Sequence, residues 1–233
     1  MERLDDLVRK MQSFGFANIR RIQYKYDLQG IMNIISKIGT YRTPNFVIDE
    51  DNRFAYVNAV KWLMGDPTMQ AIDPTTNTVV KGRLNAGLYV AGNTGTGKSW
   101  LLDILNSVAL MYHLQYYDGE VNCGLQWNAY RCDDICDDYS VHGDLRGYKS
   151  MRTICLHDFG SEPEESLYMG NRQNVIRHIL ESRGDRSNLF THITSNIPMN
   201  HDRVHKRYGD RVCSRLNDMC NYLTIKGADR RKH

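Results

Sequence analysis

The stretch GNTGTGKSW, Gly92 to Trp100, decides the fold class of this 233-residue chain. It matches G-x-x-x-x-G-K-[ST], a loop whose glycines let the backbone curl and turn its amide N–H groups toward phosphate oxygens. Lys98 supplies a mobile positive charge for the β- and γ-phosphates, and Ser99 offers a hydroxyl to Mg²⁺. The residues expected to bind ATP here are Gly92, Asn93, Thr94, Gly95, Thr96, Gly97, Lys98 and Ser99.

The sequence around this loop has the character that the motif requires. Residues 87–92 form a short apolar run, and residues 99–113 repeat apolar side chains at helical spacing. A strand, a glycine-rich loop and a helix in this order are the setting of a phosphate-binding loop. An accidental GKS in an ordinary turn is therefore a poor explanation of the pattern.

Length and composition allow one α/β domain with a small appendage. The 27.0 kDa chain is 41% hydrophobic and 24% charged, as is ordinary for globular proteins, and its net charge of +3 does not by itself indicate nucleic acid. The N-terminus lacks an apolar signal core, and no run approaches the roughly 18 apolar residues of a membrane span. The six cysteines follow no disulfide-framework spacing. These features predict a reduced, cytoplasmic protein without a membrane partner.

Strands and helices alternate along most of the chain. Strands are expected at 87–92, 153–160, 189–196 and 221–227, and helices at 99–113, 166–185 and 202–220. Towards the N-terminus, 1–40 and 54–66 have helical spacing, 41–53 is a connector and 67–85 is loop-like. This alternation predicts a mainly parallel sheet with helices on both faces, and ligands at the carboxyl ends of its strands.

Polar side chains follow two of the later strands. Asp158 ends the run TICLHDFG and is the acid that a second strand should bring to the metal. Asn196 ends the next strand, where its amide could bind the attacking water or the γ-phosphate, although an asparagine before Pro198 also suits a simple turn.

Two cysteines and two tryptophans invite simpler explanations. Cys132 and Cys136 have C-x₃-C spacing, but no second Cys/His pair lies at zinc-site distance, so an acidic surface helix or loop is the better interpretation. Trp62 and Trp100 fall at helical spacing and are expected in the core.

The chain resembles the AAA+ ATPases of the DnaC/DnaI helicase-loader and IstB group in five segments that occur in the right order. These are GLYVAGNTGTGKSWLLDIL, CLHDFGSE, ITSN, GDRVCSRLNDMC and KGADRR. The resemblance covers about residues 46–233, and the chain looks like a version of these proteins from a phage or mobile element. It implies an AAA+ P-loop NTPase domain over 46–233, preceded by a small helical segment, 1–45, that binds the partner protein. It also implies a Walker A loop at Gly92–Ser99, a Walker B acid at Asp158 and a sensor 1 residue at Asn196.

Arginines near the C-terminus complete the resemblance. Arg215, in SRL, would be the arginine finger that reaches a neighbouring subunit's ATP, with Arg211 as the close competitor. Arg231, in the tail, would be the sensor 2 arginine.

One position departs from the family, which usually carries two adjacent acids where this chain has His157 and Asp158. Either Asp158 is the metal acid and Phe159 replaces the water-activating acid, or His157 stands at the metal position and Asp158 is catalytic. Neutral imidazole is a poor Mg²⁺ ligand, which favours Asp158 beside the metal with Glu162 as a helper. Both registers predict slow hydrolysis, which suits a switch better than a motor.

The resemblance implies a DNA replication accessory ATPase that places a DnaB-type replicative helicase on single-stranded DNA. The alternative within the group is an IstB-like transposition helper that binds duplex DNA. A nucleotide kinase would need an arginine-rich lid, which the acidic run at 133–138 does not resemble. A degenerate ATPase that serves only as a binding module is a further alternative.

Overall fold

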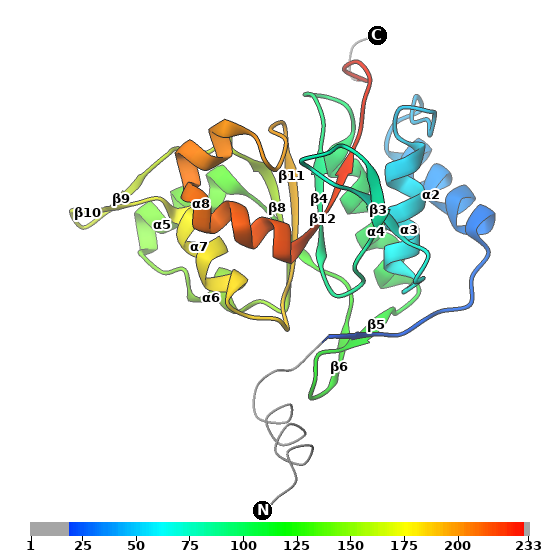
Figure 1. The fold of residues 1–233 in the computed structure, drawn as a ribbon, viewed down its shortest axis with the longest axis horizontal. Helices are drawn as coiled ribbons and strands as arrows, with labels where there is room; N and C mark the ends of the chain where they lie inside the picture. Colours follow the sequence, from blue (N-terminus) through cyan, green and yellow to red (C-terminus); the bar gives the residue numbers. More distant parts are fainter. Residues whose placement is uncertain (1–18, 231–233) are drawn as a thin grey trace, which may run out of the picture.

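A seven-stranded sheet in the order β3-β2-β12-β4-β11-β8-β7 forms the centre of the fold (Figure 1). The computed structural model describes residues 19–230, and residues 1–18 and 231–233 lie outside the described part. The strands are β2 (Gln70–Ile72), β3 (Val79–Lys81), β4 (Gly87–Ala91), β7 (Asn128–Arg131), β8 (Thr153–Phe159), β11 (Phe190–Ser195) and β12 (Cys220–Thr224). The neighbours from β12 to β7 are parallel, whereas β2 and β3 join antiparallel at one edge. The predicted, mainly parallel sheet is confirmed.

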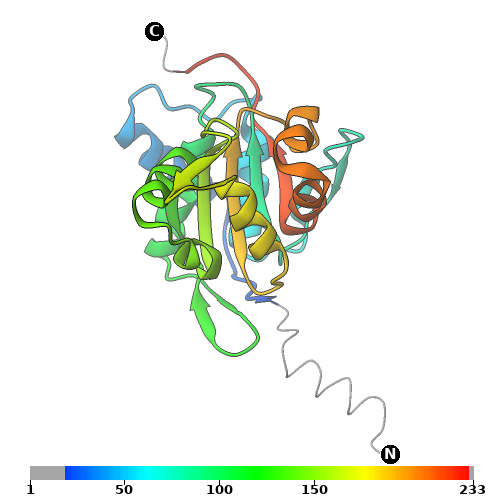
Figure 2. The ribbon, with the colours of Figure 1, turned by 90° about the vertical axis from the view of Figure 1, so that its left-hand side faces the viewer.

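Helices cover both faces of this sheet, as predicted (Figures 1 and 2). One face carries α2 (Leu28–Arg42), α3 (Arg53–Leu63) and α4 (Lys98–Met111), and the other carries α5 (Cys132–His142), α6 (Arg146–Ser150), α7 (Val175–Gly184) and α8 (Asp202–Met219). The alternation along β4 divides the core, because Leu88 and Val90 pack with the first group while Tyr89 and Ala91 pack with the second. Burial of β4 on both faces explains its uninterrupted apolar sequence.

The prediction of a loop at 67–85 is wrong, because β2 and β3 form a hairpin there. The Asp73 carboxylate accepts hydrogen bonds from the backbone N–H groups of Thr75 and Thr76, each at 2.8 Å. Asn77 follows in the left-handed region at φ 55°. Turn chemistry of this kind reverses the chain, so the polar cluster joins two short strands.

The helix expected at 166–185 begins only at Val175, where Asn174 accepts the N–H of Arg177 as N-cap. Residues before it form the hairpin β9 (Ser166–Tyr168) and β10 (Asn171–Gln173). Its two-residue turn, Met169 and Gly170, has positive φ at both positions. That geometry matches the twist of a tight hairpin and ends the helical periodicity.

The region expected to be helical over 1–40 contains a strand within its described part. β1 (Arg20–Arg21) pairs with β5 (Gln115–Tyr117), which in turn pairs with β6 (Asn122–Gly124). The Arg21 guanidinium lies 4.4 Å from the Trp62 ring centroid and donates to the carbonyls of Trp62 and Leu63, and burial lowers its pKa to about 9. A boundary at residue 45 stays a prediction, and α2 shares one hydrophobic core with α3 and α4.

None of the helices in the described part of the chain has both the length and the apolar character needed to cross a lipid bilayer.

Candidate nucleotide-binding site

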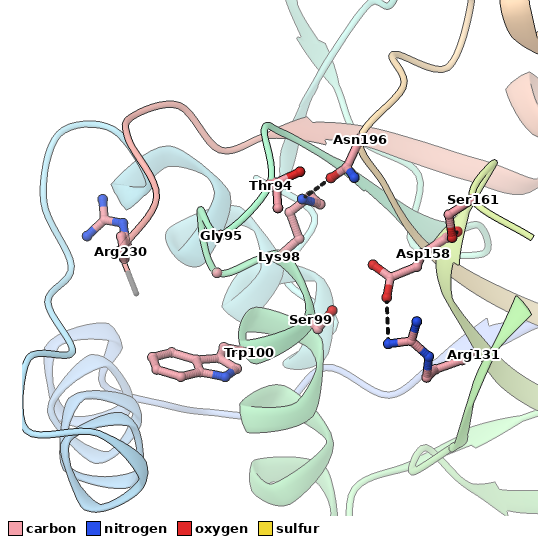
Figure 3. A pocket seen from close by; sticks show the side chains of 11 residues that line it. Thr94, Gly95, Lys98, Ser99, Trp100, Arg131, Asp158, Ser161, Asn196 and Arg230 are labelled. Atoms are coloured by element: carbon pink, nitrogen blue, oxygen red, sulfur yellow. Dashed lines mark hydrogen bonds and ion pairs between the residues drawn. The ribbon is translucent and has the colours of Figure 1, made fainter. Parts of the chain in front are cut away.

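A cavity of about 480 Å³ lies at the carboxyl ends of β4, β8 and β11 (Figure 3). This volume falls within the range that holds small-molecule ligands and cofactors. The lining residues are Thr94, Gly95, Gly97, Lys98, Ser99, Trp100, Arg131, Asp158, Ser161, Asn196 and Arg230. The structure therefore brings the predicted loop, the predicted acid and the predicted amide to one opening.

Residues 92–99 have the geometry of a phosphate cradle. Gly95 and Gly97 adopt φ angles of 78° and 95°, in the left-handed region that glycine enters without strain. A Cβ built on Gly97 would meet no atom within 4 Å, so the space beside it is open to a ligand. A Cβ on Gly95 would instead meet the Asp229 carboxylate at 1.8 Å. The loop thus suits phosphate on one side and packs against the C-terminal tail on the other.

Lys98 points into this space from the start of α4 (Figure 3). Its ammonium donates to the Asn93 carbonyl at 2.8 Å and to Asn196 Oδ1 at 2.7 Å. Ser99 lies in the first turn of α4, where free N–H groups and the helix dipole favour an anion. These groups fit a nucleotide's phosphates, and the Ser99 hydroxyl fits the oxygen-rich coordination that Mg²⁺ prefers.

Asp158 is the carboxylate that reaches the cavity from β8. Its φ of 57° is rare for a residue with a side chain. Arg131, at the end of β7, places Nη1 3.1 Å from Asp158 Oδ2 and also binds Asp133 through Nε and Nη2. The acid is therefore paired with an arginine of its own chain.

His157 turns away from the cavity toward α4. Its Nε2 lies 3.3 Å from Asp103 Oδ1, and its Nδ1 lies 3.2 Å from the Thr194 hydroxyl. These contacts occupy both ring nitrogens with protein partners. Of the two residues considered from the sequence, Asp158 lines the cavity and His157 does not, and a metal at Asp158 stays a prediction.

Comparisons with known proteins show which type of fold this is. Searches with protein-family models and among curated proteins find no match. Among solved structures, the DnaC helicase loader aligns with a TM-score of 0.51 at 16% identity, over 78% of this chain and 93% of that one. A proposed primosome component from Streptococcus pyogenes serotype M3 aligns with a TM-score of 0.53 at 18% identity, over 81% and 89% of the two chains.

The chain has a DnaC-like AAA+ fold. Its five parallel strands, numbered by their order along the chain, stand in the sequence 5-1-4-3-2 across the sheet. In this AAA+ arrangement the first strand enters the phosphate loop and lies next to the strand that delivers Asn196.

Glu162 does not line the cavity, although the sequence suggested it as a metal helper. Its carboxylate is buried, accepts the Gly160 N–H at 2.8 Å, and binds the Tyr208 hydroxyl. Arg207 lies 3.3 Å away and balances the charge. Glu162 is thus engaged in joining the end of β8 to α8.

The two candidate arginine fingers lie at the opposite end of the sheet from the cavity. Arg215 and Arg211 both pair with Asp185, which caps the end of α7 before β11 begins. The side chain of Arg215 is only 19% exposed, against 62% for Arg211. Their action on a neighbouring subunit's ATP stays a prediction. Arg231 lies outside the described residues.

The site residues assigned from the sequence did not include four residues of the cavity, namely Trp100, Arg131, Ser161 and Arg230, although Arg230 is among the late arginines that could meet a phosphoryl group. The expectation that Trp100 is core is wrong, because its ring is partly exposed at the cavity and packs against Phe46. Arg230 donates to both oxygens of Asp49 at 2.8 Å, and its N–H donates to the Gly95 carbonyl. Apart from Arg230, only Trp100 of these four residues had a signal in the sequence, because it directly follows GKS.

Cys132 and Cys136 lie on α5, a helix with acidic residues in its first turn, and both thiols are buried. Within residues 19–230, no group of three or more His, Cys, Asp or Glu side chains could hold a metal ion. Unlike Trp100, Trp62 is fully buried, as predicted.

Proposed function

We propose that this protein is an ATP-dependent DNA replication factor that places a replicative helicase on single-stranded DNA. The observation that carries the proposal is a cavity that gathers Lys98, Ser99, Asp158 and Asn196 on a DnaC-like fold. The solved protein with which this fold aligns over 93% of its length is described as a helicase loader. The role of that protein and the residues of this cavity support the same conclusion.

The residues would divide the work of ATP hydrolysis. Lys98 and the loop N–H groups would bind the phosphates, and the three donors of the Lys98 ammonium would be shared between phosphate, the Asn93 carbonyl and Asn196. The Asn196 amide would orient the attacking water. Ser99 and Asp158 would hold Mg²⁺, which neutralises phosphate charge when bound.

Slow turnover follows from the surroundings of Asp158. Arg131 lies against its carboxylate, and the adjacent position carries His157 instead of a second acid. With one partly neutralised acid, the site has weak means to activate water. A slow ATPase acts as a timed switch, in which ATP maintains the DNA-binding and self-association surfaces and hydrolysis releases them.

The first experiment measures ATP binding with a fluorescent analogue. Lys98→Ala should weaken affinity by about 10- to 100-fold, the worth of a lost charge-assisted hydrogen bond. Lys81→Ala, an exposed lysine on β3, is the control and should leave affinity unchanged. Equal affinity of both variants would contradict the proposed site.

The second experiment identifies the partner. The full chain with ATP is mixed separately with a DnaB-type helicase and with a transposase of the kind that an IstB-like helper would partner, and complexes are separated by gel filtration. The helicase should co-elute, and its unwinding of an oligonucleotide annealed to a circular single strand should depend on this protein. If only the transposase binds, a role in transposition would replace the proposed role in helicase loading.

A further inference from the structure

The neighbourhood of Asp158 contains a buried hydrogen-bond chain that the proposed function does not use. β8 and β11 pair in regular register up to Leu156 and Ile193, and they pair again at Phe159 and Ser195. Two residues of β8 therefore stand opposite one residue of β11, Thr194. This is a β-bulge, a feature that re-aims a side chain next to a site.

Side chains replace the backbone pairing that the bulge removes. The N–H of Asp158 donates to Thr194 Oγ1 at 3.1 Å, and the same hydroxyl lies 3.2 Å from His157 Nδ1. On the other side of the ring, Nε2 lies 3.3 Å from Asp103 Oδ1. Thr194 is fully buried and His157 is 8% exposed, so water does not compete at the centre of the chain.

The direction of each hydrogen bond follows from its ends. A backbone N–H can only donate, so Thr194 Oγ1 accepts from Asp158, and its own proton is available to Nδ1 of His157. A carboxylate can only accept, so Asp103 receives the proton of Nε2. In this arrangement Nδ1 of His157 accepts from Thr194 and Nε2 donates to Asp103, and the Cys155 sulfur, 3.6 Å from Nε2, demands no other arrangement.

We infer that Asp103, His157 and Thr194 form a relay that fixes the bulge and aims the Asp158 carboxylate into the cavity. His157 is thus a positioning residue, which explains how a histidine can stand where the sequence suggested a metal ligand. The relay holds Asp158 at its left-handed φ of 57°. The inference rests on the proposed role of Asp158 as the acid of the ATP site.

The test removes one link at a time in the full-length protein. Thr194→Val keeps the shape but loses the hydroxyl, and it should lower kcat for ATP about tenfold with less than a twofold change in ATP affinity. Thr194→Ser restores the hydroxyl and should recover kcat. Thr153→Val makes the same change in a buried threonine at the far end of β8 and should leave kcat unchanged.

A second variant and a spectroscopic measurement are independent of hydrolysis. Asp103→Ala alters a side chain that is 32% exposed on α4, so the fold should tolerate it, and kcat should fall at least threefold. In nucleotide-free wild type, ¹⁵N NMR should find His157 protonated on Nε2 alone, and both Thr194→Val and Asp103→Ala should shift the Asp158 amide resonance. Protonation on Nδ1, or an unmoved resonance, overturns the relay. Failure to bind ATP would overturn the proposed function and leave the NMR result to decide the relay.

Discussion

Arg131 and Asp158 form an ion pair within the candidate ATP site, and under the proposed metal role of Asp158 this pair would compete with Mg²⁺. The side chains are 54% and 32% exposed, so the pair contributes on the order of 0.2–1 kcal/mol. Arg131→Gln should free Asp158 for Mg²⁺ and lower the Mg²⁺ concentration for half-maximal ATP hydrolysis about two- to fivefold. The measurement is a Mg²⁺ titration of steady-state hydrolysis at saturating ATP.

Arg146 offers a matched control for this change. It pairs with Asp144 through the same kind of bonds, but it is 91% exposed and lies outside the cavity. Arg146→Gln should therefore leave the Mg²⁺ requirement unchanged. If Arg131→Gln instead raises that requirement, Arg131 contacts the phosphates and does not oppose the metal.

At the scale of elements, one carboxylate organises the turn between β5 and β6. Burial alone would raise the pKa of Asp118, but hydrogen bonds from the N–H groups of Val121 and Glu120, aided by Cys123 and Arg152, lower it to about 2. Because the folded pKa lies below the unfolded value, the stabilisation is complete above about pH 4 and is lost as the pH falls toward 2. Asp118→Asn should cost about 1–2 kcal/mol at pH 7, and less at pH 3.

Urea unfolding at pH 7 and pH 3 checks this expectation. Asp144→Asn is the comparison, because Asp144 also caps a turn and pairs with an arginine, but its side chain is 47% exposed, against 4% for Asp118. It should change stability little at either pH, as exposed ion pairs usually do. A loss for Asp118→Asn that is equal at both pH values would show that the charge of the carboxylate is not what stabilises the turn.

The elements that the sequence analysis predicted well are those with strong periodicity or burial. The apolar runs at β4, β8 and β11 were recognised because strands buried on both faces are continuously hydrophobic. The hairpins β2–β3 and β9–β10 were missed, since each strand has three residues, of which at most one is buried. Their signal lies in turn residues such as Met169 and Gly170, which a helical pattern conceals.

At the scale of the whole molecule, the predictable part of the site is the part attached to recognisable strands. Lys98, Asp158 and Asn196 meet because parallel strands end at one edge. Arg131 was not predictable, because β7 is short, polar and mostly exposed, and only its pairing with β8 brings it there. Arg230 likewise depends on a tail that returns across the phosphate loop.

The two hydrophobic core clusters, one on each face of the sheet, also determine the chemistry of the thiols. All six cysteines are free and buried, and burial raises the pKa of each: Cys123, Cys132, Cys136, Cys155, Cys213 and Cys220. Because the thiolate is the reactive form, the native protein should react with fewer than one equivalent of Ellman's reagent within minutes. In guanidinium chloride all six should react. Fast reaction of a thiol in the native protein would mean that the packing on one face of the sheet opens readily.

The same background makes one new thiol a probe of the cavity. Ser161 is exposed and lines the opening beside Asp158, so Ser161→Cys should add one fast-reacting thiol to an otherwise silent protein. ATP with Mg²⁺ should slow that reaction several-fold, because a bound nucleotide would cover the opening. Ser150→Cys, on the outer surface at α6, should react just as fast with and without ATP. Equal protection of both thiols would indicate a change across the whole molecule, and no protection at Ser161→Cys would place the nucleotide elsewhere.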